Sequence, residues 1–427
     1  MIDDAECHVY PGGRVGKHDP RYETLVRGFN LRWVGHPSHV QVCGDTEQVI
    51  AAVQDAVNHE KRITVRSGGH CYENFAVGND GGVIADMSPM NHVYYDDDRR
   101  AYCIEAGCTL WNVYWNLYKQ YDRVIPGGSC YSVGAGGHIT GGGYGLLSRK
   151  HGLTVDWLSG VEIVCVDEQK RAYAVIAWED GTRDERELHW ANQGGGGGNF
   201  GIVTRFWFRE LPAAPPHADL VNLAWNWSDM TQDQFTILVQ RYGEFFKKHS
   251  GLDSEYDGLF ALFHLTHKAA QQIVLTAQYV GDRPELLQNF VDAMHGPGVT
   301  VAVAQTHAVG RHFFPLRSRE IHRLPWLYAT QTLDGSGPNQ RGKYKSAYMV
   351  EPFPQYQIDV LWQYLTDGFT NPQALLQVDS YGCRINAVAP SATAVPQRSS
   401  IMKLQYQTYW TTEEETPANL QWINDFY

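Results

Sequence analysis

The sequence lacks any long apolar run. No stretch of its 427 residues approaches the roughly 18 to 20 apolar residues that a membrane-spanning helix needs, and residues 1–6 are acidic where a secretory signal is basic. Positive charge is also scarce, since 35 lysines and arginines stand against 47 aspartates and glutamates. Because nucleic-acid binding requires a basic surface, we expect a cytoplasmic protein that acts on a small molecule, with neither nucleic acid nor membrane as a partner.

Metal-ligand and nucleotide-triphosphate patterns are absent as well. The eight cysteines include no Cys-x-x-Cys pair. The eighteen histidines show no His-Glu-x-x-His spacing, and no Gly-Lys-Ser/Thr loop occurs. Cys103 and Cys108 are near enough in sequence to pair, but a cytosolic setting disfavours a disulfide. We therefore expect no metal site and mostly inert, free thiols.

Proline-rich residues 211–216 divide the chain, because proline ends regular elements and stiffens linkers. Before them, strands and helices alternate: helices are expected at 45–59 and 110–121, and strands at 40–43, 63–66, 83–86, 102–106, 161–166 and 172–177. After them, helices are expected at 232–247 and 284–293, and strands at 259–265, 272–280, 375–381 and 402–409. With 43% hydrophobic residues, the chain is long enough for two or three domains, and the fold class is α+β.

Two glycine-rich loops carry the most reactive side chains. Arg66-Ser67-Gly68-Gly69-His70 ends the strand expected at 63–66, and Pro126-Gly127-Gly128-Ser129-Cys130 begins a glycine-dense run to Gly145. Backbone with few Cβ atoms can close on a flat aromatic ligand or a diphosphate. Taken singly, His70 is an ordinary loop histidine and Cys130 an inert thiol. As a pair they favour a cofactor site with one nucleophile on each loop.

A third glycine cluster, Gly194 to Gly198, precedes an Asn-Phe-Gly-Ile-Val-Thr run that is expected to start a strand. Five glycines cost conformational entropy on ordering, so either a planar cofactor lies against them or they form a flexible surface turn. The run from Gly134 to Gly145 is not a dinucleotide fingerprint, because that pattern needs glycine at Ile139. An NAD-dependent dehydrogenase is therefore the weaker alternative.

Two late strands place polar residues at alternate positions. Period-two spacing puts Gln377, Asp379 and Tyr381 on one face, and Lys403, Gln405, Gln407 and Tyr409 on another single face. These faces either bind a sugar or are the solvent side of an antiparallel sheet.

The two loops together resemble those of the bicovalent berberine-bridge-enzyme-like flavoprotein oxidases. The resemblance implies a two-domain fold with an FAD-binding domain of the PCMH (vanillyl-alcohol-oxidase-like) type at 1–212, an antiparallel-sheet substrate domain at 213–395 and a return segment at 396–427. It implies FAD attached to His70 through the 8α-methyl group and to Cys130 through C6. Further implied cofactor contacts are Arg66, Ser67, Gly68, Gly69, Gly137, Thr140, Gly141, Gly142, Gly145, Ile202 and Val203.

The resemblance also implies the reaction. The chain is similar to the hexose oxidases of glycopeptide antibiotic biosynthesis, which implies oxidation of the C6 primary alcohol of an N-acylglucosamine on a bulky glycosylated scaffold, with O2 reduced to H2O2. A chito-oligosaccharide or anthracycline-sugar oxidase and a non-catalytic sugar-binding flavoprotein are the alternatives.

The resemblance leaves two sources for the catalytic base, Tyr144 and a tyrosine in a C-terminal segment. Tyr144 is the candidate base, although its reference pKa near 10 means that it needs help at neutral pH, and a ring that packs beside the flavin is an equal alternative. Family members carry a further catalytic tyrosine in an Asn-Tyr motif, followed by a Lys-x-x-Tyr-Asp-Pro-like helix. The sequence ends at Tyr427 without either, so we expect that a C-terminal tail is missing.

Overall fold

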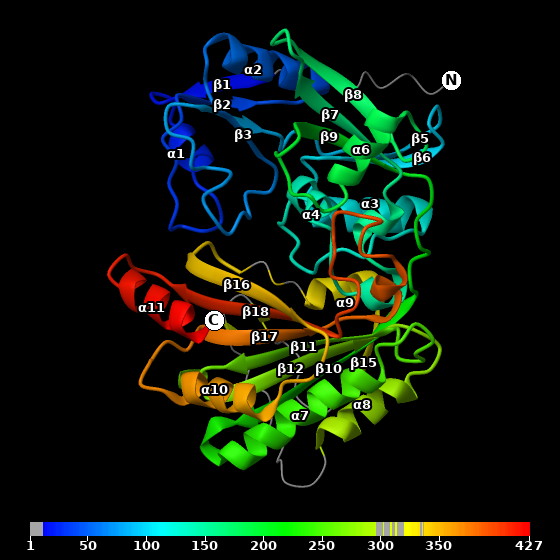
Figure 1. The fold of residues 1–427 in the computed structure, drawn as a ribbon, viewed down its shortest axis with the longest axis vertical. Coiled ribbons are helices and arrows are strands. Elements are labelled where there is room, and N and C mark those ends of the chain that lie inside the picture. Colours follow the sequence, from blue (N-terminus) through cyan, green and yellow to red (C-terminus); the bar gives the residue numbers. More distant parts are fainter. Residues whose placement is uncertain are drawn as a thin grey trace. The chain divides into compact units, whose positions relative to one another are not determined.

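The computed structural model describes residues 12–295, 302, 308–309, 312–313, 320–333, 335 and 337–427 (Figure 1). The acidic residues 1–6 lie outside the described residues. The chain forms two compact units. Unit 1 comprises the described residues up to Leu117 together with Ser132–Gly142 and Trp157–Leu211; unit 2 comprises Tyr118–Tyr131, Gly143–Asp156 and the described residues from Pro212 onward. The last point at which the chain passes from unit 1 to unit 2 lies between Leu211 and Pro212, within the proline-rich segment.

Unit 1 contains two β-sheets and short helices. Its strands are β1 (Gly13–Gly16), β2 (His39–Val42), β3 (Ile63–Arg66), β4 (Val83–Asp86), β5 (Val93–Asp96), β6 (Ala101–Glu105), β7 (Gly160–Val166), β8 (Ala172–Trp178) and β9 (Ile202–Phe208). Its helices are α1 (Tyr22–Leu25), α2 (Thr46–Asn58), α4 (Ala135–Thr140) and α6 (Arg183–Ala191), and α3 (Leu110–Tyr121) begins in it. A mixed sheet has the order β1-β2-β4-β3, and an antiparallel sheet has the order β5-β6-β9-β7-β8.

Helix α2 joins the two sheets of unit 1. Its N-cap residue, Asp45, accepts a hydrogen bond from Gln48 N at 2.7 Å. Helical spacing buries Val49 and Val53 on one face. That face packs in one apolar cluster with residues of β4, β7 and β9, so the cap and the apolar face together fix the helix between the sheets.

Unit 2 is built on one large antiparallel sheet. Its strands are β10 (His217–Asn226), β11 (Leu259–Thr266), β12 (Gln272–Tyr279), β15 (His322–Pro325), β16 (Arg341–Met349), β17 (Ala374–Ser380) and β18 (Met402–Trp410), in the order β15-β10-β12-β11-β17-β18-β16. A separate pair consists of β13 (Ala308–Val309) and β14 (His312–Phe313). Its helices are α5 (Ser148–His151), α7 (Gln232–Lys248), α8 (Glu285–His295), α9 (Trp326–Thr332), α10 (Gln355–Thr366) and α11 (Thr416–Phe426). Short 3-10 helices are Trp227–Asp229, Lys268–Ala270 and Cys383–Ala387, and a further 3-10 helix, Thr154–Trp157, ends in unit 1.

The two faces of the large sheet differ in chemistry. Figure 1 shows α7, α8 and α10 along one face, and their apolar side chains form the main core of the unit with Leu376 and Val378 of β17 and with Leu404 of β18. The alternate residues of the same strands, Gln377 and Asp379 among them, point to the opposite face. The helix-covered face supplies the hydrophobic core, and the other face carries buried polar groups.

Most of the predicted elements are present. The strands expected at 63–66 and 83–86 and the helix at 110–121 have the predicted bounds, and the other elements differ only at their ends. One segment expected to be a loop contains a helix, because α4 lies within the run from Gly134 to Gly145, and α6 was not among the predicted helices. Helix α6 begins with a capping box, because Thr182 N donates to Glu185 Oε2 at 2.6 Å and Glu185 N donates to Thr182 Oγ1 at 3.4 Å. That signal was present in the sequence.

A buried ion pair anchors residues 143–156 within unit 2. Arg398 Nη2 donates to Asp156 Oδ1 at 2.7 Å and Nη1 donates to Oδ2 at 3.0 Å, and the two side chains are 0% and 9% exposed. Arg149 is also buried, and its guanidinium donates to the carbonyl oxygens of Tyr381, His249 and Tyr256. This segment is therefore fixed by contacts of two arginines with residues that are 100 or more positions away in the sequence.

Arg398→Met is expected to lower the free energy of unfolding by about 3 to 5 kcal/mol, because it leaves the Asp156 carboxylate buried without its cation. Urea unfolding followed by tryptophan fluorescence measures the loss. The double variant Arg398→Met, Asp156→Leu should recover most of it, since no buried charge then remains. Arg283→Met removes a partner of Glu255 from an exposed pair and should cost at most about 1 kcal/mol. Equal losses for Arg398→Met and Arg283→Met would contradict this account.

Candidate functional site

The histidine loop, Ser67 to His70, follows β3 in unit 1. Gly68 lies against the backbone of Gly134, where a Cβ atom would collide, and Gly69 has a φ of +74°, which favours glycine. Within the part of the chain that the structure describes, the amide N–H groups of Ser67, Gly68 and Gly69 have no hydrogen-bond acceptor. Three successive amides without an acceptor fit the oxygens of a diphosphate, so this loop is suited to the phosphate groups of a dinucleotide cofactor.

His70 is held by two contacts of unit 1. Its Nε2 lies 2.9 Å from Ser132 Oγ, and its ring stacks on Phe29 with centroids 4.9 Å apart and 14° between the planes. Ser132 stands two positions after Cys130 in the sequence. The structure thus brings together the histidine loop and the segment that follows the predicted cysteine. The position of Cys130 relative to His70 stays a prediction, because Cys130 belongs to unit 2.

The cysteine loop is supported by a turn of unit 2. Gly145 lies against the Gly127 carbonyl so closely that a Cβ atom would collide. Ser148 Oγ donates to Pro126 O at 3.0 Å and accepts from Gly145 N at 2.9 Å. Cys130 itself is half-buried, and the seven cysteines of the described residues are free thiols. The requirement for glycine at 145 therefore comes from close backbone packing within the protein.

The glycine run after the cysteine loop forms α4. Thr140 Oγ1 donates to Gly136 O, four residues earlier in the same helix, at 2.8 Å. Gly137 and Gly141 are exposed, and Gly142 has a φ of +111°. Among the predicted cofactor contacts, Gly137 and Gly141 thus present open backbone, and Thr140 is buried.

The cluster Gly194 to Gly198 packs against α4 and β3. Gly194, Gly196 and Gly198 have φ angles of +115°, +94° and +75°, which other residues rarely adopt. Gly196 N donates to Thr140 O at 3.0 Å. The backbone conformation and this packing account for the glycines, and contact with a cofactor stays a prediction.

Ile202 and Val203 begin β9 and are 5% and 7% exposed. Arg66, predicted to add charge to the cofactor site, instead directs its guanidinium into unit 1: Nη1 donates to Leu25 O at 2.6 Å and Nε lies 3.5 Å from Asp86 Oδ2. These contacts favour a structural role for Arg66. Its role toward the cofactor stays a prediction.

The polar face of unit 2 is a continuous hydrogen-bonded chain. Tyr409 O–H donates to Gln407 Oε1 at 2.6 Å, Gln407 Nε2 donates to Gln377 Oε1 at 3.1 Å, and Gln377 Nε2 donates to Asp379 Oδ1 at 2.6 Å. Lys403 Nζ donates to Asp379 Oδ2 at 3.2 Å. The side chains of Gln377, Asp379 and Gln407 are buried, so this face is not the solvent side of the sheet. The structure brings four of the six predicted substrate residues into this chain.

The other two predicted substrate residues lie beside it. Gln405 is half-buried and pairs with Gln377 in the register of β17 and β18. Tyr381 is 1% exposed, and burial raises the pKa of its hydroxyl well above the usual value. Its ring lies 5.4 Å from that of Tyr144, so Tyr381 packs beside the predicted catalytic residue.

Tyr144 is a hydrogen-bond donor in this structure. Its hydroxyl donates to Ser380 O at 2.6 Å, and Lys403 Nζ lies 4.8 Å from the ring centroid. Burial, followed by the negative charge of Asp379, raises the pKa of this hydroxyl well above its ordinary value. These features favour the packing role, in which the phenol stays protonated. The role of Tyr144 as a base stays a prediction.

Tyr144→Phe is therefore expected to lower the free energy of unfolding by about 1 kcal/mol through loss of the bond to Ser380 O. Its kcat should change by less than about tenfold, whereas loss of a general base costs roughly 10²- to 10⁴-fold. Steady-state oxygen uptake and urea unfolding measure the two effects. A loss of kcat in the larger range, with stability unchanged, would assign the base to Tyr144.

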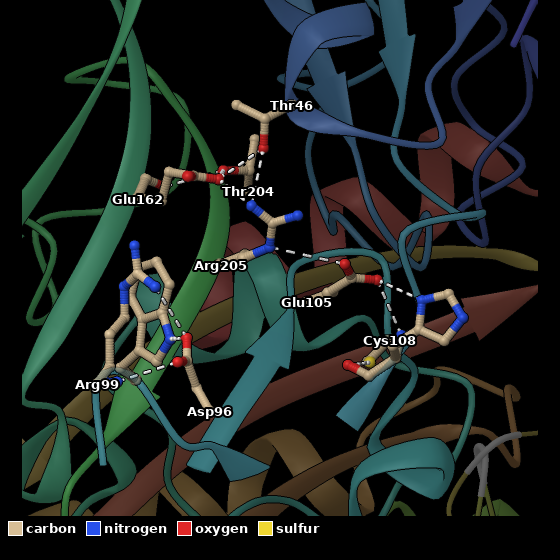
Figure 2. Close-up of polar contacts among 10 residues, drawn as sticks. Thr46, Asp96, Arg99, Glu105, Cys108, Glu162, Thr204 and Arg205 are labelled. Atoms are coloured by element: carbon tan, nitrogen blue, oxygen red, sulfur yellow. Dashed lines mark hydrogen bonds and ion pairs between the residues drawn. The ribbon is translucent and has the colours of Figure 1, made fainter. Parts of the chain in front are cut away.

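A charged cluster in unit 1 was not predicted from the sequence (Figure 2). Arg205 on β9 lies between two carboxylates: its Nη1 donates to Glu162 Oε1 at 2.8 Å, and its Nε lies 3.7 Å from Glu105 Oε1. The available signal was a charged residue within an aromatic strand, Phe206-Trp207-Phe208 following Arg205. Its partners, Glu105 and Glu162, lie on β6 and β7. They can be identified only once the register of these strands with β9 is known.

Comparisons with known proteins agree with this geometry. Residues 37–169 match a family model described as an FAD binding domain. Hexose oxidase from Chondrus crispus is 40% identical over 97% of this chain and 80% of its own length. Aclacinomycin-N/aclacinomycin-A oxidase from Streptomyces galilaeus is 39% identical over 97% of this chain and 76% of its own length. Berberine bridge enzyme-like 4 from Arabidopsis thaliana is 27% identical over 96% of this chain and 72% of its own length.

The fold is also that of solved structures. A glycopeptide hexose oxidase complexed with teicoplanin superposes with a TM-score of 0.89 at 34% identity, over 98% of this chain and 84% of that chain. The two sheets of unit 1 and the large antiparallel sheet of unit 2 are thus a PCMH-type FAD-binding fold with its substrate domain, as the resemblance predicted. None of the helices in the described ranges has the length and apolar character to cross a bilayer. The chain belongs to the FAD-linked oxidases of the berberine bridge enzyme-like family.

Proposed function

We propose that this oxidase acts on a hydroxyl group of a sugar, converting the alcohol to a carbonyl while O2 becomes H2O2. The observation that carries the proposal is the chain Tyr409–Gln407–Gln377–Asp379 on the polar face of unit 2. Amide side chains offer both donors and acceptors, which is what a ligand covered with hydroxyl groups requires. The 40% identity to a hexose oxidase supports the same substrate class.

The residues of unit 1 fit the cofactor. The amides of Ser67, Gly68 and Gly69, which have no acceptor among the described residues, suit a diphosphate, and the backbone of Gly137 has open space beside it. We place the covalent attachments of FAD at His70 and Cys130. When bound, FAD accepts hydride from the substrate and passes the electrons to O2.

Asp379 is the proton acceptor in this proposal. It is the one acidic residue of β17 and β18, and a carboxylate has about four acceptor positions, so bonds from Gln377 and Lys403 leave room for a substrate hydroxyl. Gln377 and Lys403 hold the carboxylate in one orientation. Gln405, beside this group, completes the surface for the remaining hydroxyls.

The finer proposal names the sugar. The substrate is an N-acylglucosamine on a glycopeptide scaffold, and its C6 alcohol is oxidised to the aldehyde with release of one H2O2 for each O2 consumed. A second round on the aldehyde hydrate gives the carboxylate with a second H2O2. The similarity to the glycopeptide hexose oxidase supports this choice, and the 39% identity to aclacinomycin oxidase supports an anthracycline sugar as the second candidate.

A substrate panel tests both the sugar oxidase activity and the identity of the sugar. The purified protein is mixed with a free hexose, a chito-oligosaccharide, an N-acylglucosaminyl glycopeptide and an anthracycline glycoside, and peroxide release and product mass are recorded for each. We expect the highest kcat/KM with the glycopeptide and a product that has lost two hydrogens or gained a carboxylate. A higher kcat/KM with another glycoside would contradict the N-acylglucosaminyl glycopeptide as the substrate. A yellow protein that binds sugars but releases no peroxide contradicts the oxidase.

A further inference from the structure

The carbonyl of Ala106, just after β6, is the point where two glycine loops of unit 1 meet. It accepts hydrogen bonds from Ser67 Oγ at 2.6 Å and from Gly136 N at 3.1 Å. The amide of the same residue donates to Thr204 O on β9 at 2.9 Å. One residue therefore fixes the histidine loop and the start of α4 to the same strand.

The residues next to these contacts carry the charged cluster of Figure 2. Glu105 directly precedes Ala106, and Arg205 directly follows Thr204. Glu162, on β7, accepts hydrogen bonds from Thr46 Oγ1 and Thr204 Oγ1, each at 2.6 Å. The Arg205 guanidinium on β9 thus contacts one carboxylate on β6 and one on β7, next to the hydrogen bond between Ala106 N and Thr204 O.

The cluster is held in a surrounding of low exposure. The side chains of Glu105 and Glu162 are 8% and 11% exposed, and that of Arg205 is 25% exposed. Two carboxylates with little solvent repel each other unless a cation stands between them. Glu105 is further tied to His92, whose backbone N donates to Glu105 Oε2 at 3.0 Å. Loss of the guanidinium is therefore expected to move the ends of β6 and β9, and with them the Ala106 carbonyl.

We propose that Arg205 is a positioning residue for the flavin. By neutralising Glu105 and Glu162 it fixes the position of the Ala106 carbonyl, and this carbonyl in turn fixes the histidine loop and the start of α4, which hold the cofactor. The proposal depends on FAD in unit 1 and not on the identity of the sugar.

The surroundings of Arg205 provide a direct test by chemical rescue. A cavity of about 750 Å³ in unit 1 is lined by Arg205, Glu105 and His92, with Asp86 in its wall. A guanidinium ion can therefore reach the space that Arg205→Ala leaves. Urea has nearly the same shape without the charge and serves as the matched small molecule.

The experiment compares Arg205→Ala with Arg209→Ala, each purified with its flavin. Arg209 directly follows β9 and also has two acidic partners, Glu179 and Asp180, but its side chain is 41% exposed. We expect Arg205→Ala to carry several-fold less flavin per chain than the wild type and to have an altered visible flavin spectrum. Guanidinium at concentrations far below those that unfold the protein should restore the spectrum, and urea should not. Arg209→Ala should match the wild type.

The proposal is overturned if Arg205→Ala keeps the wild-type flavin content and spectrum, if urea restores the spectrum as well as guanidinium does, or if Arg209→Ala loses as much flavin. Should Arg205→Ala fail to fold, Arg205→Gln is read in the same way, with Arg205→Lys as the variant that keeps the charge, and a wild-type spectrum in Arg205→Gln overturns the proposal. No sugar enters the measurement. A yellow wild-type protein that oxidises none of the glycosides therefore contradicts the proposed function and leaves this result standing.

Discussion

Asp379→Asn is expected to lower kcat/KM for the sugar substrate by roughly 10²- to 10⁴-fold, the range that a general acid or base contributes. The carboxylate is 2% exposed and holds Gln377 through Oδ1 and Lys403 through Oδ2. An amide has nearly the same shape but cannot take a proton from the substrate hydroxyl. It also leaves the Lys403 ammonium without its anion. Oxygen uptake at several substrate concentrations gives kcat and KM separately, and the loss should lie mainly in kcat.

Asp219→Asn is the matched control for this variant. Asp219 lies on β10 of the same sheet, is 4% exposed and accepts two hydrogen bonds of 2.9 Å from Arg323. It takes no part in the chain from Tyr409 to Asp379. We expect Asp219→Asn to lose stability and to keep kcat/KM within a few-fold of the wild type. If both variants lose activity equally, or if Asp379→Asn stays within about tenfold of the wild type, Asp379 is not the proton acceptor.

The polar face of unit 2 shows what local sequence can predict. Alternation along β17 and β18 placed Gln377 and Asp379 on one face and Lys403 and Gln407 on another, because side chains of a strand alternate with period two. The alternation did not predict that these residues of β17 and β18 lie on the same face of one sheet. That result follows from the antiparallel register, in which Asp379 pairs with Lys403 and Gln377 pairs with Gln405, and register depends on contacts that no local pattern contains.

The glycine loops show the opposite case. Their glycines indicated close backbone approach, and the structure supplies such an approach between Gly68 and Gly134 and between Gly127 and Gly145. The expected reason was a cofactor, whereas part of the requirement comes from the protein's own backbone. Composition alone does not distinguish these two causes, because both need only the absence of a Cβ atom.

The charged groups were the least predictable part. Arg205 stands 43 positions from Glu162, and Arg398 stands 242 positions from Asp156. A buried arginine can be suspected from its place in an apolar segment, but its partner follows only from the fold. For the same reason the membership of residues 118–131 and 143–156 in unit 2 could not be predicted from the sequence.

The double variant His70→Ala, Cys130→Ser is expected to lose all flavin on acid precipitation, whereas each single variant should keep it through the remaining bond. Ser132 and Phe29 hold the His70 ring within unit 1, so we expect the histidine to keep its orientation when the thiol is removed. Flavin fluorescence of the denatured chain on a gel, and the mass of the flavin-carrying peptides, measure the attachment. The two single variants should each show flavin on one peptide only, the one that contains the remaining nucleophile.

Cys71→Ser is the control, because Cys71 is a half-buried free thiol directly beside His70 and should not affect attachment. Complete loss of covalent flavin in His70→Ala alone would mean that a histidyl bond is the single tether. Covalent flavin that persists in the double variant would assign the attachment to another nucleophile, and a further loss on adding Cys71→Ser would identify it. Attachment at both positions is established only if both single variants retain flavin and the double variant does not, because only that pattern requires two independent bonds.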